Sequence, residues 1–324
     1  MRMGALRVGI IGAGHMGSYH VAALAELMDV RLTAVADLDR RRAEEVAGRY
    51  GAAAFSDASQ LVGRVDAAIV AVPTVQHYPV ARFLLESGIH VLVEKPICPE
   101  LEAARSLFRL ATEKNLVLHV GHVERYNGAV QELSQIVRYP ILIECRRLGP
   151  FSHRVREDGV VLDLMIHDLD IAMRLVNEEI VGLSAAGASV LSDRDDVANV
   201  QIRFAGGCIA NLTASRVTQN KIRTLAITQP DAYITLDYAD QELRIHRQAS
   251  SEHSLSREEL KYREQSQVER LFVHKDNPLK IELRHFLNAV RTGAVVADPE
   301  RELRSLDVAL RIVRMLNLPA PARI

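Results

Sequence analysis

The chain has 324 residues, of which 48% are hydrophobic, and a formal net charge of −1 at pH 7. This length allows two domains with separate cores, and the near-zero charge gives no general attraction to nucleic acid or to membrane surfaces. No apolar stretch approaches the roughly 20 residues that a membrane span needs. The three cysteines, Cys98, Cys145 and Cys208, lie far apart, as is typical of free thiols in a reducing compartment. We therefore expect a cytoplasmic protein whose partners are small molecules or other proteins.

An apolar run at residues 8–11 leads into glycines spaced G-x-G-x-x-G near the amino terminus. After a strand and before a helix, this spacing is typical of a dinucleotide-binding turn. The first glycine permits the tight turn, the second lets the backbone approach a pyrophosphate, and the third lets the helix pack closely on the sheet. The phosphates would lie at the helix amino terminus, whose N–H groups favour anions. The expected phosphate-binding residues are Gly12, Gly14, His15, Met16 and Gly17.

A second predicted strand, residues 30–36, ends at Asp37, roughly 20 residues after the last glycine of the turn. A carboxylate at this position accepts hydrogen bonds from the adenosine ribose hydroxyls and repels a 2′-phosphate, which favours NAD over NADP. The arginines at residues 40–42 could steady a phosphate, but a solvated helix start after Asp39 is the favoured interpretation.

The first 121 residues alternate short apolar strands with amphipathic helices, a pattern typical of a parallel sheet covered on both faces. After the strand at 66–72, the chain passes through Val72, Pro73, Thr74 and His77 at the edge where such folds bind ligands. We expect helices at residues 19–28, 40–50, 77–87 and 99–115, further strands at 52–55, 89–93 and 116–120, and a helical turn at 58–61.

The strand at 89–93 ends in Glu94-Lys95-Pro96. Lys95 would be held at the carboxyl end of a buried strand, and Pro96 restricts the conformation of the residue before it. A positioned lysine of this kind suits catalysis, although a surface salt bridge is the alternative interpretation. His119 and His122 are three residues apart in a strand and its exit, so they would not point the same way, and packing or site lining is favoured over a metal pair.

Polar residues interrupt the apolar stretch at residues 160–174. On a helix, Asp163, His167 and Asp170 share one face. They form either a satisfied network, with Asp170 paired to Arg174, or part of an active site. The sequence His167-Asp168 lacks the further ligands of a metal phosphohydrolase, and there is no G-x-S-x-G motif of a serine hydrolase.

The second half of the chain is rich in predicted strands. Alternation of apolar with polar residues, as in Val200, Ile202 and Phe204, predicts a sheet with one buried face. The other face could form a subunit interface in a homodimer or homotetramer. Residues 247–276 are highly charged, with weak helical character at 257–263, and stay unassigned. We expect strands at 141–148, 180–191, 197–204, 208–217, 221–228, 232–236 and 242–246, and helices at 128–137, 279–290 and 301–316, the last packing back towards the first domain.

The order of these motifs resembles the Gfo/Idh/MocA family of NAD(P)-dependent oxidoreductases. The resemblance rests on the glycine turn, Glu94-Lys95-Pro96, residues 121–127 and Asp163-x-x-x-His167, and it covers nearly the whole chain. The chain departs from the family pattern at two positions, where Tyr126 replaces the usual phenylalanine and Gly128 replaces the usual proline. The resemblance implies an α/β fold: a doubly wound parallel Rossmann sheet at 1–121, followed at 122–324 by an α+β domain with a predominantly antiparallel open sheet.

The resemblance also implies roles for the site residues. His167 would be the general acid/base, oriented by Asp163, and Lys95 would bond the reacting oxygen; the reverse assignment of Lys95 and His167 stays open. Glu94 and Lys95 would lie beside the nicotinamide ribose of NAD, and no metal is implied. The expected cofactor-lining residues are Thr74 and His77, and the expected substrate-binding residues are Arg125, Asn127, Arg154, Asp163 and His167.

Within the family, residues 121–127, 149–152 and 161–168 are most similar to UDP-N-acetylglucosamine 3-dehydrogenases. This similarity implies oxidation at C3 to a 3-keto sugar, a precursor of lipid A or an envelope glycan, on which an aminotransferase would act. Arg146, Arg147, Arg154 and Arg156 would suit a diphosphate-linked substrate. The alternatives are a dehydrogenase of an unlinked sugar or inositol, a non-catalytic NAD-binding sensor, and a redox-cycling glycosidase.

Overall fold

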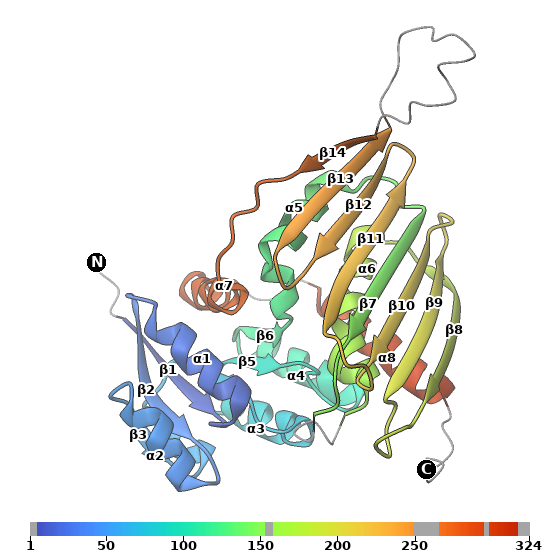
Figure 1. The fold of residues 1–324 in the computed structure, drawn as a ribbon. Coiled ribbons are helices and arrows are strands. Elements are labelled where there is room, and N and C mark those ends of the chain that lie inside the picture. Colours follow the sequence, from blue (N-terminus) through green and yellow to red (C-terminus); the bar gives the residue numbers. More distant parts are fainter. Residues whose placement is uncertain (1–4, 153–157, 249–265, 295–297, 317–324) are drawn as a thin grey trace, which may run out of the picture. The chain divides into compact units, whose positions relative to one another are not determined.

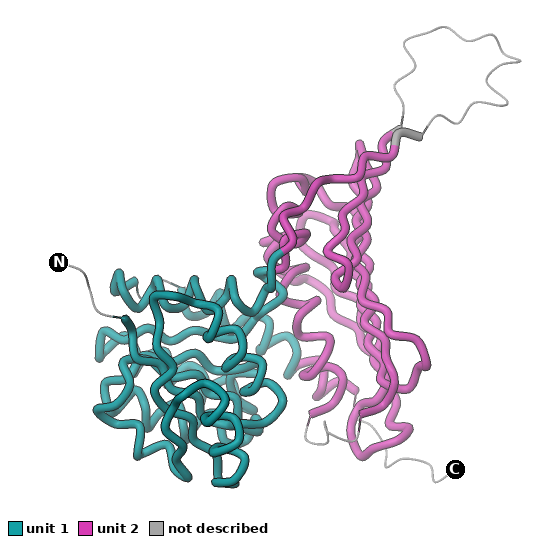
Figure 2. Tube along the Cα trace, turned by 60° about the vertical axis from the view of Figure 1, so that its left-hand side comes forward, with its two compact units in different colours: residues 1–126, 276–310 teal, residues 127–275, 311–324 magenta. Residues whose placement is uncertain are grey.

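The computed structural model describes residues 5–152, 158–248, 266–294 and 298–316. The chain forms two compact units, which Figure 2 distinguishes by colour: residues 1–126 with 276–310, and residues 127–275 with 311–324. The first unit thus includes residues 276–310 in addition to the amino-terminal part of the chain up to Tyr126. The physical reason is packing, because α7 (Pro278–Thr292) lies against α1 (His15–Ala25) and η2 (Val123–Tyr126).

The first unit is built on a six-stranded sheet in which every neighbouring pair is parallel (Figure 1). Its strands are β1 (Leu6–Ile11), β2 (Val30–Ala36), β3 (Ala53–Phe55), β4 (Ala67–Val70), β5 (His90–Glu94) and β6 (Leu118–Gly121). Their order is β3-β2-β1-β4-β5-β6, so the winding reverses between β1 and β4. This is the predicted doubly wound arrangement, and ligands bind such sheets beyond the carboxyl ends of the strands at the reversal.

Helices cover both faces of this sheet. The apolar stripes of α1 and α7 meet over one face, where Val21 and Leu24 pack with Leu283 and Phe286 on the central strands. The α1 helix begins at His15, directly after the glycine turn, and ends at Ala25. The remaining helical elements are α2 (Arg40–Gly48), η1 (Ala58–Leu61), α3 (Thr74–Glu86), α4 (Leu101–Glu113) and α8 (Pro299–Leu316), of which residues 311–316 belong to the second unit.

The second unit contains an eight-stranded sheet, antiparallel except where β7 pairs with β10. Its strands are β7 (Leu142–Leu148), β8 (Ile180–Ala188), β9 (Val197–Phe204), β10 (Ile209–Ser215), β11 (Ile222–Gln229), β12 (Ala232–Asp237), β13 (Glu242–Gln248) and β14 (Ser266–Arg270). Their order is β14-β13-β12-β11-β7-β10-β9-β8. The strand β14 pairs with β13 and lies in the charged stretch for which the sequence predicted no strand. The weak helix expected at 257–263 lies outside the described residues.

The predicted alternation places one face of this second sheet in the core. Val200, Ile202 and Phe204 of β9 are at most 1% exposed. The residues between them point to the opposite face, where the Gln201 amide donates to Asn211 Oδ1 at 3.1 Å. The buried face is covered by α5 (Gly128–Ile136), η3 (Val161–Met165) and α6 (Ile166–Val176) (Figure 1). None of the helices in the described part of the chain combines the length and the apolar character needed to cross a membrane.

Candidate active site

The glycines of the turn after β1 each meet a different steric condition. Gly12 has φ +93°, and a Cβ there would lie 2.4 Å from the carbonyl oxygen of Ala71. A Cβ on Gly17 would lie 1.8 Å from the Gly12 oxygen, so α1 packs directly on the turn. Nothing lies within 4 Å of a Cβ built on Gly14, which faces open space. The turn therefore has the shape that a dinucleotide pyrophosphate requires.

The amino terminus of α1 provides the anion-binding groups for this turn. Gly14 is its N-cap residue and has no side chain that could accept hydrogen bonds from the first N–H groups. The first turn, which includes the exposed His15, contains no acidic residue. The positive end of the helix dipole is therefore left for a ligand, and the residues present fit a dinucleotide phosphate.

Asp37 lies beside the glycine turn, just after the end of β2. Its Oδ2 accepts a hydrogen bond from the Ala13 N–H at 2.7 Å, and its Oδ1 accepts one from the Asp39 N–H at 2.8 Å. These bonds orient the carboxylate at the edge of the turn, where it can accept bonds from ribose hydroxyls. Of the neighbouring arginines, Arg42 lies 3.8 Å from Asp37 Oδ2, whereas Arg40 pairs with Glu44 on the exposed face of α2.

His77 connects the segments that follow β4 and β5. Its Nε2 lies 2.8 Å from the carbonyl oxygen of Val72, and its Nδ1 lies 2.8 Å from that of Pro96. The ring is 1% exposed, so these bonds hold the backbone of both segments together. Pro73 is the N-cap residue of α3, and Thr74 begins that helix. Contacts of Val72, Pro73, Thr74 and His77 with the cofactor stay predictions.

Glu94 ends β5 as a buried carboxylate. Its Oε1 lies 2.7 Å from His20 Nε2 of α1, and its Oε2 accepts a hydrogen bond from the Lys95 N–H at 3.2 Å. Burial would raise the pKa of Glu94, but the hydrogen bond and charge of His20, with the charge of Lys95, hold that pKa below its ordinary value. Lys95 is half-buried, and its peptide bond to Pro96 is cis. The hydrogen bond from the Lys95 N–H to Glu94 orients the backbone that carries Lys95.

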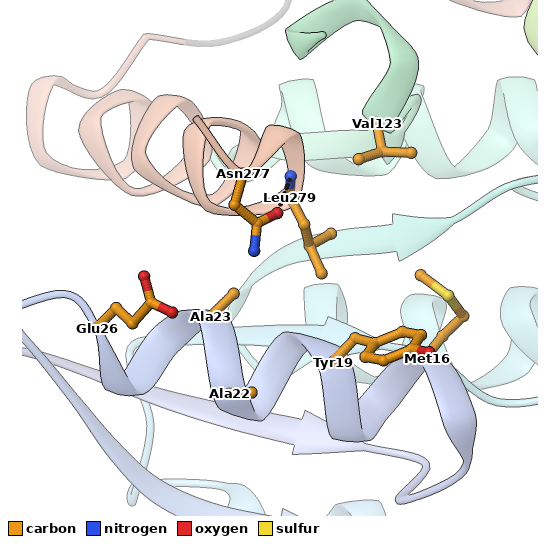
Figure 3. A pocket seen from close by; sticks show the side chains of 8 residues that line it. All are labelled: Met16, Tyr19, Ala22, Ala23, Glu26, Val123, Asn277 and Leu279. Atoms are coloured by element: carbon orange, nitrogen blue, oxygen red, sulfur yellow. Dashed lines mark hydrogen bonds between the residues drawn. The ribbon is translucent and has the colours of Figure 1, made fainter. Parts of the chain in front are cut away.

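A pocket of about 300 Å³ lies beside α1 and the start of α7 (Figure 3). Met16 is the only predicted cofactor residue in its lining, and the other predicted phosphate and ribose residues lie outside it. The pocket is therefore distinct from the glycine turn. Its lining residues are Met16, Tyr19, Ala22, Ala23, Glu26, Val123, Asn277 and Leu279.

In the second unit, Asp163 and His167 lie on a helix that is not regular. Asp163 belongs to the π-helical turn η3, and His167 lies in the first turn of the following α6. The sequence predicted a regular α-helix at 160–174, whereas the structure has a π-helical turn at its start and an α-helix only from Ile166. Asp195 fixes the start of the turn, because its Oδ2 accepts from the Val161 N–H at 2.8 Å. Turns of this kind occur frequently at functional sites.

Two neighbouring carboxylates on α6 are paired with arginines. Asp168 makes a bidentate ion pair with Arg147 of β7, at 3.0 and 2.8 Å, and both side chains are buried. Arg147 is therefore not available to a substrate diphosphate, which corrects the suggestion made from the sequence. Asp170 lies 3.4 Å from Arg174, so the structural pairing that the sequence offered for these two residues is confirmed.

The predicted substrate residues make contacts within their own units. Asn127 is the N-cap of α5: its Oδ1 accepts from the Ala129 N–H at 3.1 Å, and its Nδ2 donates to the Tyr238 oxygen at 3.0 Å. Arg125 pairs with Glu302 in the first unit. Arg154 lies outside the described residues. The substrate-binding roles of these residues stay predictions.

Sequence reasoning missed several buried polar residues near these sites. His20 follows the glycine turn by one helical turn and pairs with Glu94. Glu282 lies on α7 within the apolar stripe that includes Leu279 and Phe286, and it is 0% exposed. An acidic residue at a position where the helical pattern expects an apolar one could have been recognised in the sequence as a candidate buried carboxylate. The contact of Asp195 with η3 had no comparable local signal.

Comparison with known proteins identifies the family. Residues 6–122 match the model of an oxidoreductase family with an NAD-binding Rossmann fold, and residues 128–235 match the GFO/IDH/MocA C-terminal domain. The chain is 34% identical over 310 residues to UDP-N-acetylglucosamine 3-dehydrogenase of Acidithiobacillus ferrooxidans, covering 95% of this chain and 96% of that protein. It is also 34% identical over 231 residues to an inositol 2-dehydrogenase of Rubrobacter xylanophilus, covering 66% of this chain and 65% of that protein.

Solved structures agree with this assignment. UDP-N-acetylglucosamine 3-dehydrogenase from Acidithiobacillus ferrooxidans has a TM-score of 0.88 at 32% identity, with 97% of this chain and 98% of that chain covered. A levoglucosan dehydrogenase in complex with NADH has the same fold, with a TM-score of 0.83 at 21% identity and 96% of each chain covered. The chain therefore belongs to the Gfo/Idh/MocA family of NAD-binding oxidoreductases.

Proposed function

We propose that this protein is an NAD-dependent dehydrogenase that oxidises the C3 hydroxyl of UDP-N-acetylglucosamine to a ketone. The observation that carries the proposal is the extent of similarity. The relative named for this activity matches 95% of the chain, whereas the inositol dehydrogenase from Rubrobacter xylanophilus matches 66%. The similarity to the first relative therefore runs through the second unit, which carries the predicted substrate residues.

The reaction removes a hydride from carbon and a proton from the hydroxyl. NAD supplies the hydride acceptor when it is bound, and the turn at Gly12 and Gly14 with the Asp37 carboxylate would hold it. In this proposal His167 accepts the hydroxyl proton, Asp163 orients the imidazole, and Lys95 donates a hydrogen bond to the oxygen as negative charge develops. The reverse assignment of Lys95 and His167 satisfies the same chemistry.

The first experiment incubates the purified protein with NAD and UDP-N-acetylglucosamine and follows NADH absorbance together with the mass of the sugar. An aminotransferase with its amino donor removes the keto product and pulls the equilibrium forward. A loss of two hydrogens from the sugar is expected, and it should vanish in Lys95→Ala and His167→Ala. The matched controls are Lys114→Ala and His274→Ala, because both side chains are exposed.

The outcomes separate the alternatives. Demonstrated NAD binding without oxidation of UDP-N-acetylglucosamine would refute this substrate, and oxidation of inositol or a free sugar in its place would assign the protein to that activity. NAD binding with no oxidation of any of these compounds would favour a sensor. Release of a free sugar without net NADH would favour a redox-cycling glycosidase.

The proposal extends to partners. An aminotransferase that acts on the 3-keto product is the expected next enzyme, and a cytoplasmic location follows from the composition. Assembly into a homodimer or homotetramer would use the open face of the second-unit sheet, where Asn199, Thr213 and Gln201 are solvent-facing in the single chain. Light scattering of the purified protein would test this assembly, and a monomer would refute it.

A further inference from the structure

Ionisable side chains collect between the first sheet and the helices α1 and α7. In the pairing of β5 with β6, Leu92 lies opposite His119 and Glu94 lies opposite Gly121, so Glu94 and His119 project from the same face. The helices add His20, Glu282 and His285 to this face, with Tyr126 from η2. Within the otherwise apolar layer, these residues form what we call the buried acid–imidazole cluster: His20, Glu94, His119, Tyr126, Glu282 and His285.

Contacts join members of the cluster at its inner end, next to Lys95, and at its outer end, at the surface. The strand register places Glu94 and His119 on the same face of the sheet between these ends. At the inner end, Glu94 bonds His20 and accepts from the Lys95 N–H. Between the two ends, Glu282 Oε1 lies 3.8 Å from His119 Nε2. At the outer end, the Tyr126 hydroxyl lies 3.3 Å from the same His119 nitrogen and 3.1 Å from Nδ1 of the exposed His285.

Glu282 holds a proton at the centre of this cluster. It is 0% exposed, and neither of its oxygens has a hydrogen-bond partner within the described residues. An ionised carboxylate in such a place is very costly, so the protonated form is favoured. Burial, with the negative charge of Glu94, raises the pKa of Glu282 well above its ordinary value. Glu282 is therefore a proton donor next to an imidazole.

Tyr126 and His285, at the outer end of the cluster, can accept and release that proton. Burial and the charge of His119 lower the pKa of His285, which keeps its imidazole neutral and able to accept a proton. A tyrosine hydroxyl both donates and accepts, so Tyr126 can receive a proton from one imidazole while passing its own to the other. The remaining charged groups that face His285 are Arg125 and Glu302, which are paired with each other.

We propose that the buried acid–imidazole cluster carries the proton released by substrate oxidation from Lys95 to solvent at His285, with the Tyr126 hydroxyl as its last internal link. The inference rests on the proposed dehydrogenase activity and on the second assignment given above, in which Lys95 takes the hydroxyl proton and His167 bonds the reacting oxygen. The substrate O–H bond breaks and its proton passes to Lys95 and then to the Glu94 carboxylate. Glu282 takes that proton and gives its own to His119, from which Tyr126 and His285 pass one proton to water. No electrons move along this path, and each group ends as it began.

The test uses Tyr126→Phe, which removes one hydroxyl and keeps the ring. In a stopped-flow experiment in weak buffer, one channel records NADH and the other records a pH-indicator dye. In the wild type, the two signals should coincide. In Tyr126→Phe, NADH formation in the first turnover should be unchanged, whereas proton release should slow by about tenfold. Added imidazole should restore the rate of proton release in Tyr126→Phe. Tyr78→Phe is the matched control, because its hydroxyl bonds Ser106 outside the cluster.

A second readout requires neither cofactor nor substrate. Histidine NMR signals of the full chain, followed against pH, should show that the titrations of His119 and His285 depend on each other in the wild type and become independent in Tyr126→Phe. In Glu282→Gln, the titration of His119 should shift because its neighbouring proton donor is lost. Coincident NADH and proton release in Tyr126→Phe would overturn the proposal, as would histidine titrations unchanged in both variants.

The two proposals fail in distinguishable ways. Absence of NADH with the wild type and UDP-N-acetylglucosamine would refute the proposed substrate, and the NMR titrations would then decide on the cluster alone. Normal NADH formation with undelayed proton release would refute only the proton path. Loss of proton release in a His167 variant that still reduces NAD in the first turnover would assign the proton to the second unit and also refute the path.

Discussion

Replacement of Glu282 by glutamine should stabilise the protein at neutral pH and leave its stability nearly unchanged in acid. The side chain is fully buried, and burial, with the charge of Glu94, raises its pKa well above the ordinary value of 4.5. Below that ordinary value, the carboxyl is protonated in both the folded and the unfolded chain. As the pH rises further, only the unfolded chain loses the proton, so the free energy of unfolding falls by about 1.4 kcal/mol per pH unit.

Glutamine has nearly the same shape and cannot ionise, so Glu282→Gln escapes this loss. Its advantage over the wild type should therefore grow by about 1.4 kcal/mol per pH unit above the ordinary pKa, until the pH reaches the pKa of the folded state. Urea unfolding of both proteins at a series of pH values measures the difference. Circular dichroism is the suitable probe because the chain contains no tryptophan.

The control for this series is Glu113→Gln, because Glu113 is exposed on the surface of the same unit. Its effect on the free energy of unfolding should be small at every pH. A difference between Glu282→Gln and the wild type that does not vary with pH would refute the reasoning, since it would mean that burial does not shift the titration of Glu282. If Glu282→Gln instead became less stable than the wild type as the pH rises, Glu282 would be ionised in the folded protein and stabilised by a cation.

Further predictions concern the cofactor residues Asp37 and Gly17 and the buried ion pair of Arg147. Asp37→Ala should weaken NAD binding roughly tenfold or more, because hydrogen bonds to a charged group contribute about 1.5–3 kcal/mol. Titration calorimetry would measure the change in the dissociation constant of NAD. Gly17→Ala would place a Cβ 1.8 Å from a backbone oxygen and should abolish NAD binding, whereas Gly48→Ala, with nothing within 4 Å, should not change it. Arg147→Met should cost about 3–5 kcal/mol in urea unfolding by leaving Asp168 buried and unpaired, and a second change, Asp168→Leu, should recover most of that loss.

The sequence by itself determined the features that depend on short spacings. The glycine turn could be predicted because its spacing is local: Gly12 and Gly17 leave no room for a Cβ, and Gly14 leaves open space for a ligand. The alternation in β9 likewise predicted its buried face, since successive side chains on a strand point to opposite sides. These properties are local, so they can be seen along the chain without knowledge of its tertiary contacts.

Only the tertiary structure decided how distant polar residues are used. Nothing near His77 in the sequence shows that each of its ring nitrogens lies 2.8 Å from a backbone oxygen. Nothing near Arg147 shows that it pairs with Asp168. The hydrogen bond from Asp195 to the start of the π-helical turn joins residues that are 34 apart in the chain. The raised pKa of Glu282 has burial and the charge of the distant Glu94 as its causes. The physical reason is that burial and electrostatic interaction depend on distances in space, and the partners in these cases come from elements far apart in the chain.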